Sequence, residues 1–315
     1  MNRPALDYDE LFKRFLDDGA VLPEGKEVIF CLGTQKAGTS WLWHYLKDHW
    51  ACHVFYQKEL HFFDALHINR NEQVHRISNR LNRAVEKLRQ ASPEEYNQAL
   101  TNVRRLGHRL DMYRAGQEGR AAYLANMMVG SGKARYLCDL TPGYQLLSED
   151  GLRDMASVGR SPRFLFIMRD PVARLWSQVR MNASDAGAEG AAMAQRSQDV
   201  IRRLLKEGGP ELKRADYRGA LERMDNVLPA DRTLVLFYED LFQQETADRL
   251  CGFLGIKSRP VDTRVFYEGS KANLPEDLRL ACREMLKDQY DYVLDRFGER
   301  VPAKWRAGAP AAVTG

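Results

Sequence analysis

The run Val28-Ile-Phe-Cys-Leu32 constrains the fold most, because every residue in it is apolar and Gly33 ends it. An unbroken apolar run of this length is typical of a strand that is buried on both faces of a parallel sheet. Trp41-Leu-Trp-His-Tyr-Leu46 follows, with apolar residues at helical spacing. The pattern predicts a strand, a glycine-bounded loop and a helix in succession.

The same pattern recurs along the chain. Arg163-Phe-Leu-Phe-Ile-Met168 is a second apolar run, and Asp170 and Pro171 after it suit the N-cap and first turn of a helix. Tyr136-Leu-Cys138 and Thr233-Leu-Val-Leu-Phe-Tyr238 are two more short runs with helix-compatible segments behind them. Repeated units of this kind predict an α/β fold, with a P-loop-like central parallel sheet that is flanked by helices and carries helical insertions.

The chain has 315 residues, a length at which one large α/β domain with insertions is common. We therefore predict a single domain over residues 1–315. Helix-forming residues and arginines dominate from about residue 65 to 133, which indicates a helical insertion, and residues 183–216 are expected to form one or two helices. The Ala/Gly/Pro-rich end, about 306–315, is expected to be frayed.

Charge and cysteine content limit the classes of partner. The net charge of +4 is far below that of a dedicated nucleic-acid binder, so small anionic ligands are favoured over nucleic acid. The start of the chain resembles no signal peptide, and no apolar stretch approaches the roughly 20 residues of a membrane-spanning helix. The five cysteines lack metal-ligand spacing, which favours reduced structural thiols. We expect a cytoplasmic protein without an integral membrane segment.

Gly33 and Gly38 frame the loop between the first strand and its helix. Such a turn directs backbone N–H groups and the positive helix end toward one point, which makes an anion site. The glycine spacing equals that of the nucleoside-triphosphate P-loop, but the lysine stands inside the loop as Lys36 instead of after the second glycine. The displaced lysine argues against a magnesium-triphosphate site, and no metal is expected. The alternative is an ordinary turn with a solvated Lys36.

The full string Gly-Thr-Gln-Lys-Ala-Gly-Thr-Ser-Trp-Leu resembles the 5′-phosphosulfate loop of the sulfotransferase family. The resemblance implies that the donor is 3′-phosphoadenosine 5′-phosphosulfate and that Lys36 stabilises the charge on the departing phosphate. The residues that the resemblance assigns to donor binding are Thr34, Gln35, Lys36, Ala37, Gly38, Thr39, Ser40 and Trp41.

Arg169 ends the second clear strand, and Ser177 lies eight residues further on, about two helical turns later. Both belong at the carboxyl ends of the strands, where α/β sheets bind ligands. The string Arg-Asp-Pro-Val-Ala-Arg-Leu-Trp-Ser resembles the 3′-phosphate motif of the same family, which implies that Arg169 and Ser177 clamp the second phosphate. A strand-end salt bridge and a neutral helix residue are the alternatives. We expect Arg174 to be an exposed helical charge and Trp176 to belong to the core.

Transfer to a hydroxyl or an amine needs a proton acceptor, and Glu59 and His61 are the candidates. In an extended segment, residues two apart share a face. Lys58-Glu-Leu-His-Phe-Phe-Asp64 resembles a stretch of the glycan sulfotransferases of the heparan-sulfate type, in which the glutamate is the proposed base. The resemblance favours Glu59 over His61. An ion pair of Glu59 and a structural role for His61 are the alternatives.

The resemblance is looser elsewhere. In Leu137-Cys-Asp-Leu-Thr-Pro-Gly-Tyr144, Leu140 occupies the position of a lysine that contacts a polyanionic glycan or the reaction centre in relatives. A heparan-like acceptor is therefore not implied. The segment Glu268 to Pro275 resembles the C-terminal cofactor loop, where Lys271 is either a ligand of the 3′-phosphate or an exposed loop lysine.

The sequence predicts a sulfotransferase that releases 3′-phosphoadenosine 5′-phosphate. The alternatives are a P-loop phosphotransferase that uses a nucleoside triphosphate and magnesium, and a catalytically silent nucleotide-binding protein. The acceptor is a small molecule, a glycan or a lipid, and neither it nor the oligomeric state follows from the sequence. The 13 Lys and Arg residues against 6 Asp and Glu between His67 and Arg135 suit an acidic acceptor, although solvated helix faces are the simpler explanation of these charges.

Overall fold

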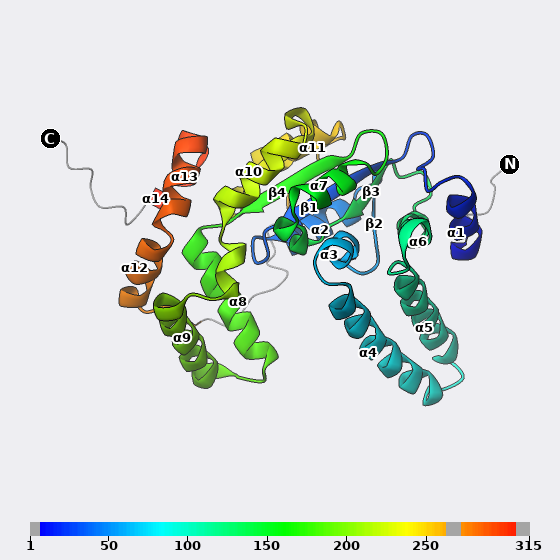
Figure 1. The fold of residues 1–315 in the computed structure, drawn as a ribbon, viewed down its shortest axis with the longest axis horizontal. Coiled ribbons are helices and arrows are strands. Elements are labelled where there is room, and N and C mark those ends of the chain that lie inside the picture. The colour runs from blue at the N-terminus through cyan, green and yellow to red at the C-terminus, as the bar shows by residue number, and fades with distance from the viewer. Residues whose placement is uncertain (1–6, 263–271, 307–315) are drawn as a thin grey trace. The chain divides into compact units, whose positions relative to one another are not determined.

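A computed structural model describes residues 7–262 and 272–306 of the chain (Figure 1). Five parallel strands form a central sheet in the order β2-β3-β1-β4-β5, with helices flanking it. The strands are β1 (Glu27–Gly33), β2 (Cys52–Val54), β3 (Tyr136–Asp139), β4 (Arg163–Met168) and β5 (Thr233–Phe237). The predicted α/β fold with a central parallel sheet is confirmed.

The register of the sheet explains why the first apolar run has no polar positions. Val28 of β1 lies opposite Leu137 of β3, and His53 of β2 lies opposite the same leucine, both in parallel pairs. Every residue from Val28 to Gly33 is buried. β2 has only three residues, two of them half-buried, and no sequence pattern predicted it.

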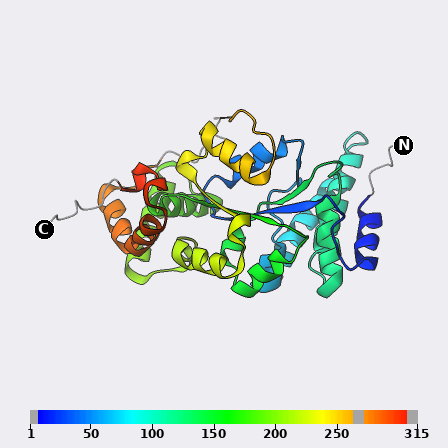
Figure 2. The same cartoon turned by 90° about the horizontal axis from the view of Figure 1, so that it is seen from above.

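The chain divides into two compact units, which are described separately. The first unit comprises Met1–Cys31 and Leu46–Phe164. In it, α1 packs against α6, and α4 and α5 pack together as a helical hairpin (Figures 1 and 2). Its helices are α1 (Tyr8–Asp17), α3 (Phe62–His67), α4 (Arg70–Arg89), α5 (Tyr96–Asp111), α6 (Gly116–Met128) and α7 (Glu149–Ala156).

The second unit comprises Leu32–Tyr45 and Leu165–Gly315. Trp305 is fully buried in it and makes ring contacts with Tyr217, Phe237 and Tyr290. Its helices are α2 (Thr39–Lys47), α8 (Pro171–Asp185), α9 (Gly190–Glu207), α10 (Tyr217–Val227), α11 (Gln244–Leu254), α12 (Glu276–Met285), α13 (Lys287–Phe297) and α14 (Ala303–Arg306).

Several local predictions can be compared with these elements. Asp170 caps α8 by accepting a hydrogen bond from the Ala173 N–H at 2.8 Å, and Pro171 opens the helix, as predicted. Helices α4, α5 and α6 occupy the segment in which the composition predicts helices, and α8 and α9 share the segment 183–207. All five cysteines are buried, and within the described residues none of them forms a disulfide bond.

The predicted single domain stays a prediction, and residues 307–315 of the predicted frayed tail lie outside the described residues.

None of the helices in residues 7–262 and 272–306 combines the length and the apolar character that crossing a bilayer requires.

Candidate active site

The loop between β1 and α2 is held at its start and folded tightly after it. Thr34 donates its backbone N–H to the carbonyl of Ile167 in β4 at 2.7 Å, and the Ala37 N–H donates to the carbonyl of Thr34 at 3.2 Å. Helix α2 begins directly after the loop, at Thr39. The amino end of a helix and a glycine-bounded turn therefore meet at one point, which is the arrangement that stabilises bound anions. We call residues 33–40, which include the first two residues of α2, the phosphate loop.

Gly38 is required in this loop for two reasons. Its φ of +85° lies in the left-handed region, where residues with a side chain are strained. A Cβ at this position would also lie 2.6 Å from Cδ1 of Leu241 and 2.9 Å from Cδ2 of Tyr238. Lys36 adopts a φ of +71° without being a glycine. Residues held in such a conformation are concentrated at ligand sites, where the surrounding structure enforces it.

The structure brings Arg169 to the phosphate loop. Its Nη1 donates to the carbonyl of Lys36 at 2.9 Å, and its guanidinium lies 4.3 Å from the centroid of the Tyr238 ring. Tyr217 fixes the backbone of the same residue, because its hydroxyl donates to the Arg169 carbonyl at 2.7 Å. The phosphate loop, which carries Lys36, is thus hydrogen-bonded to Arg169 at the end of β4, and each of the two segments contributes a cationic side chain.

Other predicted donor-binding residues occupy different environments. Thr34, Ala37, Thr39 and Trp41 are buried, and the indole N–H of Trp41 donates to the carbonyl of Asp262 at 3.0 Å. Gln35, Ser40 and Ser177 are half-buried. Within the described part of the chain, Ser177 forms no hydrogen bond to the phosphate loop or to Arg169. Lys271 lies outside the described residues.

The prediction that Arg174 is an exposed charge is wrong. Its side chain is fully buried, with Nη1 donating to Oε1 of Gln178 at 2.7 Å and Nη2 to the carbonyl of Glu211 at 3.4 Å. Burial lowers its pKa to about 10. The reason is that α9 and the short 3₁₀ segment Pro210–Arg214 both pack on α8 and cover the side of the helix that carries Arg174. Trp176 is buried, in agreement with its predicted place in the core.

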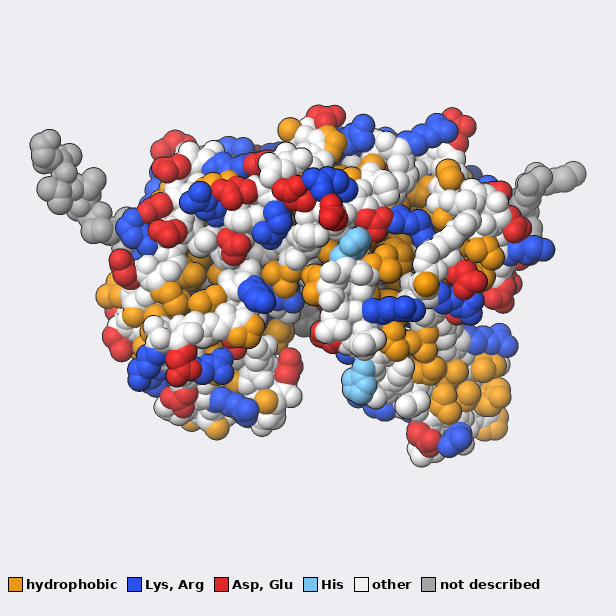
Figure 3. Space-filling view, viewed as in Figure 1, with side chains coloured by type: hydrophobic (Ala, Val, Ile, Leu, Met, Phe, Trp, Pro, Cys, Tyr) orange, Lys and Arg blue, Asp and Glu red, His pale blue; other side chains and the backbone are white. Residues whose placement is uncertain are grey.

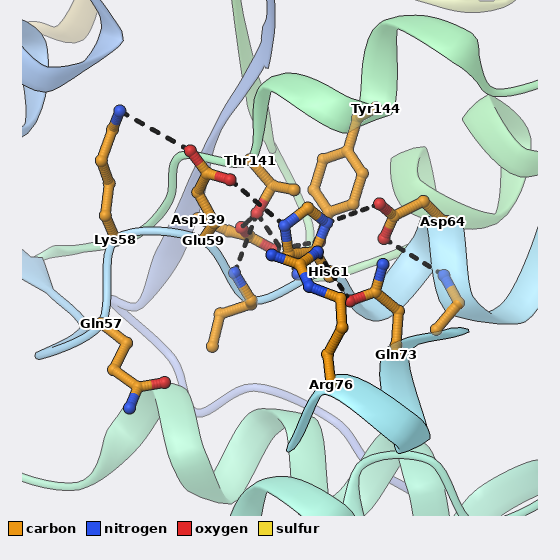
Figure 4. Close-up of polar contacts among 12 residues, drawn as sticks. Gln57, Lys58, Glu59, His61, Asp64, Gln73, Arg76, Asp139, Thr141 and Tyr144 are labelled. Atoms are coloured by element: carbon orange, nitrogen blue, oxygen red, sulfur yellow. Dashed lines mark hydrogen bonds and ion pairs between the residues drawn. The ribbon is translucent and has the colours of Figure 1, made fainter. Parts of the chain in front are cut away.

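In the first unit, His61 lies between two carboxylates (Figure 4). Its Nδ1 is 2.6 Å from Oδ2 of Asp64, and its Nε2 is 3.2 Å from Oε2 of Glu59. His61 has a φ of +56° and stands at the N-cap of α3, so the chain turns there and Asp64 comes back to face the ring. We call Glu59, His61 and Asp64 the acid-histidine cluster. The pairing of Glu59 with His61 agrees with the predicted shared face, whereas Asp64 was not predicted to take part.

The charges of the cluster follow from this geometry. Burial lowers the pKa of His61, but the hydrogen bonds to Asp64 and Glu59 and the charges of both carboxylates outweigh it and raise the pKa to about 9. For Glu59, burial raises the pKa, but the hydrogen bond from His61 and the charge of Lys58 outweigh it and hold the pKa below its usual value. At neutral pH, His61 is therefore an imidazolium and both of its ring nitrogens donate.

A buried carboxylate supports the backbone of the cluster. Asp139, at the end of β3, is fully buried and accepts hydrogen bonds from the hydroxyls of Thr141 at 2.6 Å, Tyr144 at 2.7 Å and Tyr123 at 3.0 Å. Burial raises its pKa to about 6, although the three hydroxyls favour the charged form. Because each hydroxyl gives its proton to Asp139, each oxygen is left free to accept.

Two of these oxygens accept backbone N–H groups of the cluster segment. Thr141 Oγ1 accepts the Leu60 N–H at 3.0 Å, and the Tyr144 hydroxyl accepts the Phe62 N–H at 3.1 Å. On the carbonyl side, Arg109 Nη2 donates to the carbonyls of Glu59 at 3.0 Å and Leu60 at 3.2 Å. Residues 59–62 are thus held from both sides, which fixes the direction of the two side chains that could accept a proton.

The segment that contains Leu140 therefore has a structural role that the sequence did not predict. Asp139, Thr141 and Tyr144 build the support of the cluster, and Leu140 between them is fully buried. The position that carries a lysine in relatives belongs to the hydrophobic core of the first unit here.

We expect Gly38→Ala to destabilise the chain by at least about 2 kcal/mol, since it adds a close contact to the cost of a left-handed backbone. Gly25→Ala is the matched control, because Gly25 has a φ of +78° and open space around its Cβ position. It should cost about 1 kcal/mol. Denaturant unfolding measures both, and equal costs for the two variants would contradict the close contact.

NMR titration of the imidazole should give His61 a pKa of about 9, and Asp64→Asn should lower it toward the ordinary value of histidine. The raised pKa stabilises the fold below about pH 6.5, and this contribution, about 3 kcal/mol, is lost as pH rises to 9. In Asp64→Asn, the free energy of unfolding should fall less between about pH 6.5 and pH 9 than it does in the wild type. A wild-type pKa near 6.5 would show that the cluster is not assembled as described.

Comparison with known proteins identifies the family of the chain. Residues 28–260 match the model of the sulfotransferase family, which covers more than half of the chain. No curated protein sequence matches the chain significantly.

One solved structure shows a related fold. The crystal structure of a sulfotransferase from Alicyclobacillus acidocaldarius is similar with a TM-score of 0.57 and 18% identity, over 89% of this chain and 99% of that one. The sulfotransferase domain of the Synechococcus PCC 7002 olefin synthase aligns with a TM-score of 0.45 and 18% identity, over 93% of each chain. The fold of the first relative and the family match over residues 28–260 agree, and the chain belongs to the sulfotransferase family.

Proposed function

We propose that this enzyme transfers the sulfuryl group of 3′-phosphoadenosine 5′-phosphosulfate to a hydroxyl or an amine of an acceptor. The observation that carries the proposal is the hydrogen bond from the Arg169 guanidinium to the backbone carbonyl of Lys36, which ties one cationic side chain to the glycine-bounded loop that carries the other. A donor with phosphate at both ends of its nucleoside calls for two cationic positions. Membership in the sulfotransferase family supports sulfuryl transfer over phosphoryl transfer.

The proposed reaction is an in-line displacement at sulfur. The bond between sulfur and the acceptor oxygen or nitrogen forms while the bond between sulfur and the 5′-phosphate oxygen breaks, and the acceptor loses a proton. Lys36 and the N–H groups of the phosphate loop stabilise the negative charge that develops on the leaving phosphate. Arg169 holds the 3′-phosphate in this proposal.

The acid-histidine cluster supports Glu59 as the proton acceptor. His61 with a pKa of about 9 already carries its proton at neutral pH, and its two N–H groups are directed at Asp64 and Glu59. Glu59 is ionised, and its side chain is 36% exposed, compared with 12% for His61. We propose that Glu59 takes the proton as the bond to sulfur forms and that His61 orients the carboxylate.

The segment around Glu59 also bears on the class of acceptor. The stretch Lys58 to Asp64 resembles that of glycan sulfotransferases of the heparan-sulfate type, and we propose a glycan-type acceptor on this ground. The buried Leu140 excludes a contact of that position with an acceptor, so any cation that binds an acidic glycan has to come from another part of the chain.

Calorimetry tests the donor. We expect 3′-phosphoadenosine 5′-phosphate to bind in the presence of a chelator, and Lys36→Met and Arg169→Gln each to weaken binding by about tenfold or more, since charged hydrogen bonds to phosphate are lost. The exposed Lys133 supplies the control variant Lys133→Met, which should bind as the wild type does. Magnesium-dependent binding of ATP without binding of the bisphosphate would overturn the proposal in favour of a phosphotransferase.

The pH profile of turnover tests the base, with an acceptor found by screening with radiolabelled donor. If Glu59 accepts the proton, kcat/KM stays level between pH 7 and 8, because the pKa values of Glu59 and of the supporting Asp139, about 6, lie below this interval and that of His61 lies above it. Glu59→Gln should lower turnover about 100-fold or more with donor affinity unchanged. The exposed Glu72 supplies the control Glu72→Gln.

A profile that rises steadily toward pH 9, or near-normal turnover of Glu59→Gln, would assign the proton transfer to neutral His61 instead.

A further inference from the structure

Four cationic side chains form a line on one face of α4. Arg76, Arg80, Arg83 and Lys87 follow each other at intervals of four, three and four residues, and all four are exposed. Residues at this spacing lie above one another on a helix, so the line is about 16 Å long. We call these four residues the cationic stripe.

The cationic stripe is not neutralised by carboxylates. Among the residues that the structure describes, none of its members forms an ion pair, whereas their neighbour Arg89 pairs with Glu86 at 2.8 Å. Arg114 pairs with Asp111 and Glu118 in the same unit. Arg80 is exposed as a residue, but partial burial of its guanidinium lowers its pKa, and the charges of Arg109, Arg76 and Arg83 add to this effect. Such a line of like charges attracts anions.

One end of the stripe adjoins the acid-histidine cluster. The charge of Arg76 is one of the influences that hold the pKa of Glu59 down, and Figure 4 shows Arg76 and Gln73 beside the cluster. Arg80 Nη1 donates to Oε1 of Gln57 at 3.4 Å, two residues before Glu59. The stripe therefore leads from the proposed base outward along α4.

The other end of the stripe reaches a groove between α4 and α5. The groove has a volume of about 770 Å³, and Glu95 is the carboxylate that lines it. Two cations and four side-chain amides line it as well: Lys87, Arg105, Gln90, Asn97, Gln98 and Asn102. Figure 3 shows Lys and Arg side chains, in blue, and hydrophobic side chains, in orange, on the visible face of this hairpin. Side-chain amides donate to and accept from hydroxyls, so the lining suits a ligand that is rich in hydroxyls.

We propose that the α4–α5 hairpin is an acceptor subsite that binds an acidic oligosaccharide. The cationic stripe binds the carboxylates or sulfates of the sugar chain, and the amides of the groove bind its hydroxyls. The end of the sugar chain at Arg76 presents the hydroxyl or amine that is sulfated. This inference rests on the proposed function, and it names the acceptor class of the same enzyme.

Two other anionic partners fit the hairpin less well. Single-stranded nucleic acid binds through aromatic side chains on which bases stack, and the lining of this groove contains none. A bilayer surface binds helices that present a broad apolar face opposite their cations. In α4 the positions on the buried side of the stripe, Ile77 and Ala84, are already covered within the unit.

Calorimetry with two hexasaccharides, one charged and one neutral, tests the subsite on the full chain. A hexasaccharide of galacturonate should bind, a neutral glucose hexasaccharide should not, and added salt should weaken the binding, because exposed charges are screened. The triple variant Arg80→Gln, Arg83→Gln, Lys87→Gln should weaken it by about tenfold or more. The control triple variant removes the same charge from exposed positions of α9, at Arg196, Arg202 and Lys206, and should bind within about twofold of wild type.

Binding of 3′-phosphoadenosine 5′-phosphate is measured on the same three proteins and should not change. Loss of bisphosphate binding in wild type would refute the proposed function, whereas intact bisphosphate binding with no galacturonate binding, or with equal binding by both triple variants, would refute only the subsite. Vesicles of phosphatidylcholine with phosphatidylglycerol form a further arm. Stripe-dependent binding to these vesicles without binding of galacturonate would also overturn the proposal and assign the stripe to a membrane surface.

Discussion

The charge of Asp139 is the constraint on which the candidate base depends. A carboxylate in a fully buried place is costly unless hydroxyls or N–H groups surround it, and here three hydroxyls do. Because these hydroxyls are oriented by Asp139, two of their oxygens accept the backbone of residues 60 and 62. The position of Glu59 and His61 is thus determined by a charge that touches neither side chain.

The fold and part of the candidate site could be predicted from the sequence. Long apolar runs specify buried strands, and Asp170-Pro171 specifies a helix start, so both appeared where the pattern placed them. The three residues of β2 are too few to show a period. Arg174 was misplaced because a lone arginine on a helix gives no sign that two other segments will cover it. The contact of Arg169 with the phosphate loop followed from the rule that strand ends meet at one edge of a sheet.

The cluster was only half predictable. Alternation places Glu59 and His61 on one face, but Asp64 reaches the ring because His61 adopts a left-handed backbone conformation, which residues with a side chain seldom do. The support by Asp139 could not be predicted either, because aspartate is almost never fully buried and the sequence gives no reason to expect a buried carboxylate at this position. The motif around Leu140 resembles a segment of the family. The resemblance does not show that the hydroxyls of Thr141 and Tyr144 accept backbone N–H groups of residues 60 and 62.

The line of arginines on α4 has a consequence for how specificity could change in such a chain. The phosphate loop and Arg169 lie in residues 33–40 and 163–169, whereas the stripe and the groove lie in one continuous segment, residues 70–111. A sequence exchange confined to this segment would replace the outer acceptor contacts and leave the residues assigned to the donor untouched. Relatives that keep Arg109, which supports the base segment from α5, could therefore diverge in what they modify by recombining a single helical hairpin, while the donor chemistry stays under separate selection.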